Sequence, residues 1–209
     1  MTQLAGRFIT LEGIEGAGKS TVAQFVRGWL AARGIAARVT REPGGTPLAE
    51  RVRAIVLEPG AEPIPPEAEM LLMFAARSIH LASLVRPALE RGEWVICDRF
   101  TDATRAYQGG ARGLSAALIE QLASAVHGDL APDCTLLLDL PVEEGLRRAR
   151  ARAAASDRFE QERGPFFELV RQAYLDLARR EPRRIRVIDA SRPLETVQSE
   201  VAALLESMV

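Results

Sequence analysis

The chain has 209 residues, of which 47% are hydrophobic and 26% charged, and this composition excludes disordered, fibrous and coiled-coil classes. Its length is that of one large α/β domain, and a formal net charge of -1 argues against an extended nucleic-acid-binding face. Lys19 is the single lysine among 27 basic residues, and asparagine is absent.

The placement of the cysteines and the pattern of apolar residues predict the cellular compartment of the protein. Cys97 and Cys134 each lie in an apolar run without CxxC spacing, which predicts buried free thiols rather than a disulfide or zinc ligands. The chain shows no signal-peptide pattern, and no apolar stretch is expected to approach the ~18 residues that a membrane span needs. We therefore expect a cytoplasmic protein with no membrane partner.

Short β-like runs alternate with longer helical patterns along the chain. Strands are expected at 7–11, 37–40, 93–97, 134–139 and 184–189, and helices at 19–33, 47–57, 66–90, 115–127, 141–152, 165–180 and 193–207. Gly34, Gly92 and Gly128 stand where glycine often ends a helix. Strands separated by helices predict one α/β domain over residues 1–209, with a five-stranded parallel sheet and helices on both faces.

The first strand leads into Gly13-Ile-Glu-Gly-Ala-Gly-Lys-Ser-Thr21, which matches the P-loop pattern G-x-x-x-x-G-K-[ST] over residues 13–20. Glycines let backbone N–H groups wrap closely around phosphate oxygens at a helix N-terminus. Lys19 is placed to reach the β/γ-phosphates of ATP, and Ser20 to hold Mg²⁺. The motif predicts a three-layer P-loop NTPase-type fold, with nucleotide contacts from Gly13, Ile14, Glu15, Gly16, Ala17, Gly18, Lys19, Ser20 and Thr21.

Several classes of P-loop protein can be set aside. Guanine-specific switches resembling Ras need an Asn-Lys-x-Asp element, which a chain without asparagine cannot contain. No LSGGQ-like signature of ABC ATPases is present, and the length leaves little room for a motor protein. A small-metabolite kinase remains, and a non-catalytic ATP-binding regulator is the alternative from a different class, although it would need a damaged site.

Further polar segments follow the expected second and third strands, where ligands of such sheets bind. Arg41 and Glu42 open the segment Arg41-Glu42-Pro43-Gly44-Gly45-Thr46, and Arg41 is a weaker phosphate candidate. Asp98 is placed to reach Mg²⁺ or a metal-bound water, and Arg99 offers a fork suited to phosphate. Phe74 and Arg77, at positions i and i+3, share a helix face, so one can stack on a base while the other bonds its edge.

Together with the P-loop, these segments resemble bacterial thymidylate kinases nearly from end to end. The matching segments are residues 42–46, 73–77, 98–99, 106–110 and 157–160. The resemblance implies transfer of phosphate from ATP to dTMP, with Mg²⁺ and a homodimer. A kinase for another nucleoside monophosphate or small metabolite is the nearer alternative.

The resemblance also implies roles for single residues. Arg99 lies near the dTMP phosphate, Phe74 stacks on thymine, Arg77 contacts its O4, Tyr107 closes over the deoxyribose and Glu15 faces the sugar hydroxyl. A carboxylate beside phosphates needs an offsetting partner, so we expect one for Glu15. The implied substrate-binding set is Arg41, Glu42, Phe74, Arg77, Arg99, Tyr107 and Gln108.

An arginine-rich segment, about residues 148–163, is the implied lid. Arg148, Arg150, Arg152 and Arg158 are its implied triphosphate contacts, and the implied catalytic set is Glu15, Lys19, Arg99, Arg150, Arg152 and Arg158. One subgroup of the family has arginine at the position of Gly16, so glycine here implies a catalytic arginine in the lid. The chain departs from the common pattern at Phe100, Ala103 and Arg105. His80 and His127 receive no role.

Overall fold

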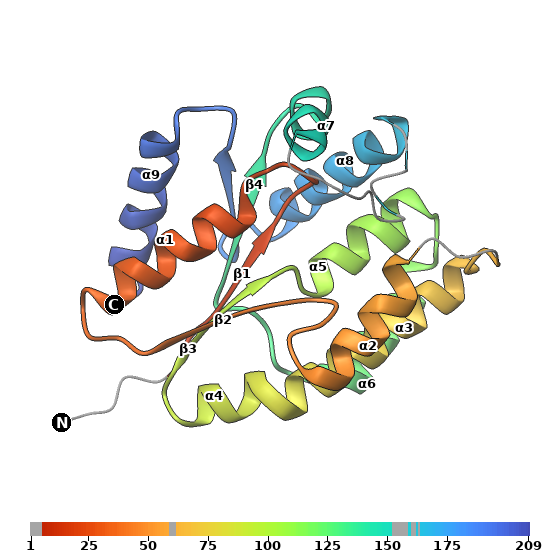
Figure 1. Ribbon diagram of the computed structural model, residues 1–209, viewed down its shortest axis with the longest axis horizontal. Helices are drawn as coiled ribbons and strands as arrows, with labels where there is room; N and C mark the ends of the chain where they lie inside the picture. Colours follow the sequence, from red (N-terminus) through yellow and green to blue (C-terminus); the bar gives the residue numbers. More distant parts are fainter. Residues whose placement is uncertain (1–5, 59–61, 152–158, 160–161, 163) are drawn as a thin grey trace.

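A five-stranded parallel sheet in the order β2-β3-β1-β4-β5 forms the centre of the computed structural model, which describes residues 6–58, 62–151, 159, 162 and 164–209 (Figure 1). The strands are β1 (Phe8–Glu12), β2 (Ala37–Arg41), β3 (Trp94–Asp98), β4 (Cys134–Asp139) and β5 (Ile185–Asp189). All five were predicted to within one residue; β1, β3 and β4 are almost completely buried, whereas the edge strands β2 and β5 are only partly buried. The carboxyl ends of β1 and β3, which are paired neighbours, lie at one edge of the sheet.

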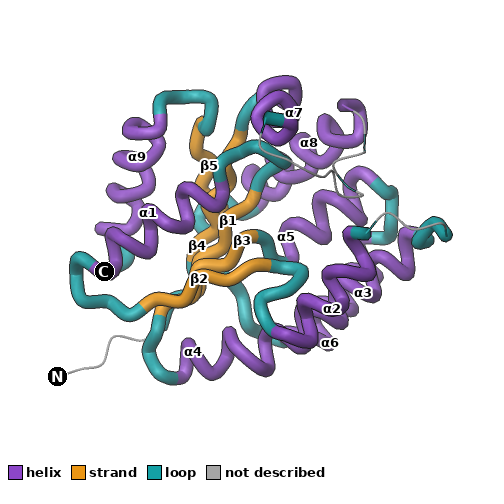
Figure 2. The backbone as a smooth tube through the Cα atoms, in the orientation of Figure 1, coloured by secondary structure: helices purple, strands orange, loops and turns teal. Residues whose placement is uncertain are grey.

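Helices flank both sides of this sheet, as the tube view shows (Figure 2). They are α1 (Lys19–Ala31), α2 (Pro47–Leu57), α3 (Pro66–His80), η1 (Leu81–Val85), α4 (Arg86–Glu90), α5 (Thr101–Thr104), η2 (Arg105–Ala111), α6 (Ala116–His127), α7 (Val142–Arg150), α8 (Gly164–Arg180) and α9 (Leu194–Glu206). α1 and α9 lie together on one side, and α5 and α8 lie on the other. The α/β architecture expected from the sequence is confirmed.

The helical segment formed by α5 and η2 was not predicted. Its sequence contains Gly109, Gly110 and two threonines, which are poor helix formers, so local propensity gives no signal. Tertiary packing supplies the stability instead. A Cβ at Gly110 would lie 2.5 Å from the Cβ of Ala173, so the glycine permits η2 to pack closely on α8. The ring of Tyr107 packs edge-on against Tyr174 of α8.

The expectation for apolar stretches was wrong in one place. The continuous helical stretch Pro66–Glu90 is long and apolar enough to cross a membrane, by length and composition alone. However, it carries Glu69, Arg77 and His80 as buried side chains, and all three bond to other side chains inside the protein. Buried, paired ionisable groups of this kind are typical of a core helix.

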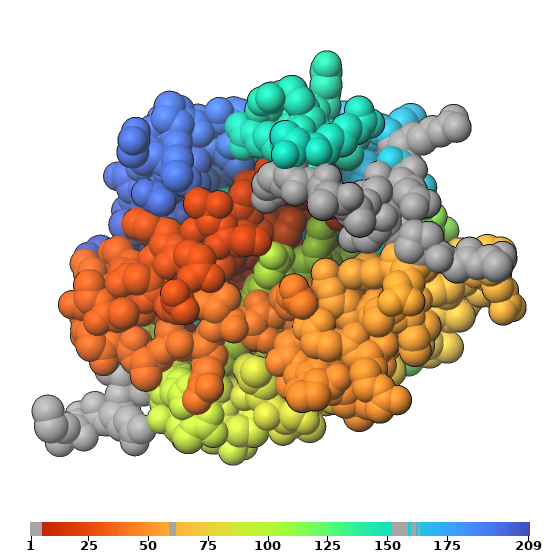
Figure 3. Space-filling view, viewed as in Figure 1, coloured from red at the N-terminus to blue at the C-terminus, as the bar shows by residue number. Residues whose placement is uncertain are grey.

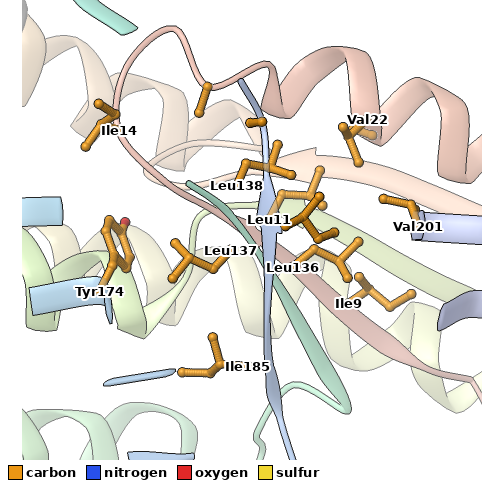
Figure 4. Packing of buried hydrophobic residues seen from close by; sticks show 14 of the residues in the cluster. Ile9, Leu11, Ile14, Val22, Leu136, Leu137, Leu138, Tyr174, Ile185 and Val201 are labelled. Atoms are coloured by element: carbon orange, nitrogen blue, oxygen red, sulfur yellow. The ribbon is translucent and has the colours of Figure 1, made fainter. Parts of the chain in front are cut away.

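The main core lies between the sheet and its flanking helices (Figure 4). Ile9 and Leu11 of β1 pack with Leu136 and Leu138 of β4 and with Val22 of α1. Every residue of β1 is buried, including Glu12 at its end. The rigid centre of the sheet therefore fixes the start of the P-loop. The space-filling view shows the surface hollowed between α1 and the α2–α3 pair (Figure 3).

Candidate active site

A pocket of about 310 Å³ lies at the carboxyl ends of β1, β2 and β3. It is lined by P-loop residues 15–20, by residues 41–43 at the end of β2, by Met73 and Arg77 of α3, by residues 98–100 at the end of β3, and by Tyr107 and Gln108 of η2. Most of the residues singled out in the sequence thus meet in one cavity, although they lie far apart in the chain.

The P-loop adopts the conformation that its glycines permit. Gly13, Gly16 and Gly18 have φ of 133°, 76° and 90°, a region that other residues rarely adopt. Lys19 folds back onto the loop, where its Nζ donates to the carbonyl oxygens of Gly13 and Ile14, each at 3.0 Å. Burial and the nearby Arg99 lower the pKa of Lys19. The carboxylates of Asp98 and Glu15 act in the opposite direction on Lys19, so both charge types meet at this end of the cavity.

The P-loop packs against α7 through two glycines. A Cβ at Gly16 would lie 1.9 Å from the carbonyl oxygen of Gly145, and a Cβ at Gly145 would lie 2.7 Å from the carbonyl oxygen of Glu15. Neither position can accept a side chain without movement of the backbone. The start of α7 is therefore held against the loop.

Glu15 has the offsetting partners that its place beside phosphates requires. Arg99 Nη2 donates to Glu15 Oε1 at 2.7 Å, and the Tyr107 hydroxyl donates to both carboxylate oxygens, at 3.0 and 2.8 Å. The Arg99 guanidinium carbon lies 4.6 Å from the centroid of the Tyr107 ring. The three side chains form one cluster at the cavity wall.

Arg99 has a φ of 73°, and within the described part of the chain it is the single non-glycine residue with a positive φ. Three contacts hold this backbone: Arg99 N donates to Leu11 O at 2.9 Å, Phe100 N donates to Glu12 Oε1 at 2.7 Å, and Cys97 Sγ donates to Arg99 O at 3.1 Å. Backbone strain of this kind costs about 1–3 kcal/mol and clusters at functional sites. The contacts direct the Arg99 side chain to Glu15 at the cavity wall.

Glu12 is a site-adjacent residue that sequence reasoning missed. Besides the Phe100 N–H, it accepts a hydrogen bond from the Tyr174 hydroxyl at 2.6 Å, and it is fully buried. Burial, together with the charge of Asp102, raises the pKa of Glu12 to about 8. The sequence did offer one signal for Glu12: a carboxylate in a strand whose other residues are expected to be completely buried.

Asp98 and Ser20 both line the cavity, and they fit a magnesium site. Asp98 Oδ1 is buried and has no hydrogen-bond partner among the described residues, which leaves a carboxylate oxygen for a ligand. Ser20 is exposed at the start of α1. Oxygen ligands of this type are those that Mg²⁺ prefers, usually together with waters and substrate phosphates.

Arg77 and Glu42 form a buried ion pair, with 2.6 Å between Arg77 Nε and Glu42 Oε2. Arg77 Nη2 donates to the carbonyl oxygen of Phe100 and to the hydroxyl of Thr104, each at 3.1 Å. Arg77 Nη1 is buried and lacks a partner in the described structure. His80, which received no role from the sequence, completes this group by bonding Glu42 Oε1 at 2.9 Å.

The other predicted acceptor residues lie at or beside the cavity. Gln108 lines it and donates to Glu69 at 2.8 Å. Arg41 lines it and makes two hydrogen bonds to Glu50, at 3.1 and 2.9 Å. Phe74 differs, because its ring is buried in a cluster with α6 and is not among the cavity-lining residues. Its centroid nevertheless lies 4.8 Å from the Arg77 guanidinium carbon.

The three residues that depart from the family pattern lie at or beside the cavity. Phe100 is buried and supplies the carbonyl that Arg77 bonds, and Ala103 lines the cavity. Arg105 does not line the cavity, because it pairs with Glu120 and Asp102.

The cysteines and His127 are structural. Cys97 and Cys134 are buried free thiols, as predicted. His127 bonds the hydroxyl of Thr101 at 3.1 Å. Glu42, His80 and Cys97 bring ligand-type atoms within 4.8 Å of one another, but burial raises the pKa of the Cys97 thiol well above its usual range, and Arg77 already pairs with Glu42. This group is suited to hydrogen bonding rather than to holding a cation.

The arginines of the implied lid are only partly described. Arg148 donates to Glu144 at 2.8 Å and to the carbonyl oxygen of Ala190 at 3.0 Å, and Arg150 is exposed at the end of α7. Neither lines the cavity. Arg152 and Arg158 lie outside the described residues. Phe159 lines the cavity and packs edge-on against Tyr107.

Comparisons with known proteins agree on one family. A family model described as thymidylate kinase matches residues 11–201. The chain is 59% identical to the thymidylate kinase of Chromohalobacter salexigens, over 96% of this chain and 95% of that protein, and 58% identical to that of Alkalilimnicola ehrlichii, over 98% and 94%. The crystal structure of thymidylate kinase from Ehrlichia chaffeensis is similar, with a TM-score of 0.76 and 31% identity over 96% and 99% of the two chains.

Proposed function

This chain belongs to the thymidylate kinase family, and we propose that its cavity is where the γ-phosphoryl group of ATP passes to dTMP. The protein is an ATP-dependent nucleotide kinase, and its products are ADP and dTDP. One observation carries the assignment of the site: the P-loop and the buried Arg77 line the same cavity. Donor phosphates and acceptor nucleotide are thereby brought within reach of each other.

In the reaction, an oxygen of the dTMP phosphate bonds to the γ-phosphorus of ATP, and the bond from that phosphorus to the β–γ bridging oxygen breaks. The electron pair of the broken bond leaves with ADP. Such transfers need little covalent help from the protein, so catalysis comes from positioning and charge stabilisation. Lys19 exchanges its two backbone carbonyls for phosphate oxygens, and Arg99 binds the acceptor phosphate.

We assign the magnesium ion to Ser20 and Asp98, which both line the cavity, and the unpartnered buried Oδ1 of Asp98 supports this assignment. When bound, Mg²⁺ neutralises part of the phosphate charge. Asp98→Asn keeps the size of the side chain and removes its charge. We expect this variant to need a much higher magnesium concentration for half-maximal activity, while its thermal stability stays near that of the parent.

The acceptor nucleotide is held by residues around Arg77. We propose that Arg77 Nη1 donates to the thymine O4, and that Phe74, which packs against that guanidinium behind the cavity wall, reaches the base only after the acceptor nucleotide has bound. Glu15 faces the sugar hydroxyl, and Tyr107 closes over the deoxyribose. Arg41, Glu42 and Gln108 complete the acceptor side, and Arg148, Arg150, Arg152 and Arg158 contact the triphosphate from the lid.

A homodimer is the assembly that we propose, and exposed apolar side chains support it. Leu48 and Ile55 of α2 are 51% and 58% exposed, and Leu71 of α3 is 54% exposed. These three side chains lie on α2 and α3, which pack against each other. Leu71→Glu should shift the sedimentation of the protein from a dimer to a monomer, whereas Leu169→Glu, which lies on α8 outside this helix pair, should leave it unchanged. We further infer a soluble cytoplasmic enzyme without nucleic-acid or membrane partners, which the two free buried thiols support.

The decisive experiment is ADP production from ATP and magnesium with dTMP, dUMP, UMP, CMP, AMP or GMP as the acceptor. We expect the highest kcat/KM with dTMP and little ADP formation without an acceptor. Equal rates with all six acceptors would overturn the assignment of dTMP. Binding of ATP without any transfer would instead support a regulatory protein.

A further inference from the structure

His80 is fully buried, yet it lies in direct contact with the acceptor side of the cavity. Its Nδ1 is 2.9 Å from Glu42 Oε1, and its Nε2 is 2.7 Å from the hydroxyl of Thr40. The site described above gives this imidazole no task. Both ring nitrogens are nevertheless occupied, which indicates a defined orientation.

The partners fix which nitrogen carries the proton. A carboxylate that pairs with Arg77 accepts hydrogen bonds, so we take His80 Nδ1 as the donor to Glu42 Oε1. In that tautomer, His80 Nε2 accepts from the Thr40 hydroxyl. This arrangement satisfies both contacts of the ring.

The chain of contacts ends at Arg77, which lines the cavity. Glu42 Oε2 receives Arg77 Nε at 2.6 Å, while Arg77 Nη2 is held by the Phe100 carbonyl and the Thr104 hydroxyl. Three contacts therefore fix the guanidinium plane. The buried Nη1, without a partner among the described residues, is the nitrogen left for a ligand.

The loop after β2 is shaped around the same imidazole. Gly45 has a φ of 84°, and a Cβ there would lie 2.4 Å from Thr40 Oγ1 and 2.8 Å from His80 Nε2. Glycine at this position therefore lets the loop approach the ring closely. Glu42 and Gly45, which belong to one short segment of sequence, thus both contact His80.

We infer that His80 is a positioning residue for acceptor selectivity, which acts through Glu42 on the Arg77 donor. Because a guanidinium has only donors, the fixed Nη1 favours a pyrimidine with a carbonyl at C4 over one with an amino group there. Loss of the His80 donor leaves Glu42 Oε1 unpaired and frees the carboxylate to turn. The guanidinium of Arg77 is then no longer held in one orientation. The inference rests on the proposed placement of the base against Arg77.

The test compares His80→Leu, His80→Asn and Thr40→Val with the parent enzyme. Loss of the buried hydrogen bond to Glu42, the one that reaches Arg77, is worth about 1.5 kcal/mol, so His80→Leu should raise the KM for dTMP roughly tenfold. It should also lower the ratio of kcat/KM for dTMP over dCMP, with the KM for ATP unchanged. An asparagine amide can replace the Nδ1 donor, so His80→Asn should recover most of both losses.

Thr40→Val keeps the shape of the side chain and removes only the hydroxyl that bonds Nε2. It should give a smaller change in the same direction, and it tests the inference even where His80→Leu does not fold. His127→Leu is the matched control, because His127 is also buried and also bonds a threonine hydroxyl. It should lower the melting temperature and leave both KM values unchanged.

Two results would overturn the inference while leaving the kinase assignment intact. The first is a parent enzyme that prefers dTMP together with folded His80 and Thr40 variants whose KM and dTMP/dCMP ratio are unchanged. The second is an equal rise in the KM values for dTMP and ATP. A parent enzyme without any preference for dTMP would refute the proposed function itself.

Discussion

Replacing Glu12 with glutamine should change how the stability of this protein depends on pH. Glu12 is fully buried, and its pKa is raised from 4.5 to about 8 by burial and by Asp102. Between these two values the folded protein holds a proton that the unfolded chain has released. Stability therefore falls as the pH rises through this window, and the loss levels off above pH 8.

The size of the effect follows from the pKa difference. One bound proton changes the free energy of unfolding by about 1.4 kcal/mol per pH unit, which gives a loss of roughly 3 to 4 kcal/mol between pH 5 and pH 8. Glutamine has nearly the same shape and carries no titratable proton. Its carbonyl can accept from the Phe100 N–H, and its amide can donate to the Tyr174 oxygen, so the two contacts of Glu12 persist.

Urea unfolding of the parent and of Glu12→Gln at pH 5, 6, 7 and 8 measures this difference directly. The variant should gain stability relative to the parent as the pH rises, by roughly 3 kcal/mol over the range. Glu195→Gln, at an exposed position on α9, is the control and should follow the parent. Parallel curves for the parent and Glu12→Gln would show that Glu12 ionises normally in the folded protein, and would refute the reasoning.

Three further substitutions test the site. Lys19→Ala should lower kcat by at least roughly a hundredfold, while the protein still folds, because the hydrogen bonds of the ammonium go to two P-loop carbonyls; an active variant would remove the role given to the P-loop lysine. Tyr107→Phe deletes the hydroxyl that bonds Glu15 and should raise the KM for dTMP about fivefold with the KM for ATP unchanged; unchanged steady-state kinetics would contradict this. Gly145→Ala should destabilise the protein by about 1–3 kcal/mol and raise the KM for ATP, because its Cβ meets the P-loop backbone. Gly28→Ala, where a Cβ meets nothing within 4 Å, should instead stabilise the protein in thermal unfolding, and equal effects at the two glycines would contradict the close contact.

The sheet and most helices were predictable because burial and periodicity are local signals in this chain. The apolar run at residues 134–139 predicts a buried strand from its own sequence, and the glycines of the P-loop predict its turn. The segment 101–111 was not predictable on those grounds. This helical segment packs closely on α8 at Gly110. A contact between distant parts of the chain leaves no pattern in the local sequence.

The residues of the site also divide into those that a local sequence pattern indicates and those that it does not. Residues with a motif, such as Lys19 and Asp98, line the cavity. The supporting residues were not found, because Glu12 and His80 act through partners far away in the sequence. The positive φ of Arg99 was also hidden, since glycine is the usual sign of that conformation.

The contact between Gly16 and Gly145 restricts how this family member can supply a catalytic arginine. A Cβ at Gly16 would lie 1.9 Å from the Gly145 carbonyl oxygen, so an arginine in the P-loop requires α7 to stand farther from the loop. A close-packed α7 and a P-loop arginine are therefore mutually exclusive arrangements. An arginine substituted for Gly16 would need a compensating substitution at Gly145, near the start of α7. The two positions should therefore be substituted together.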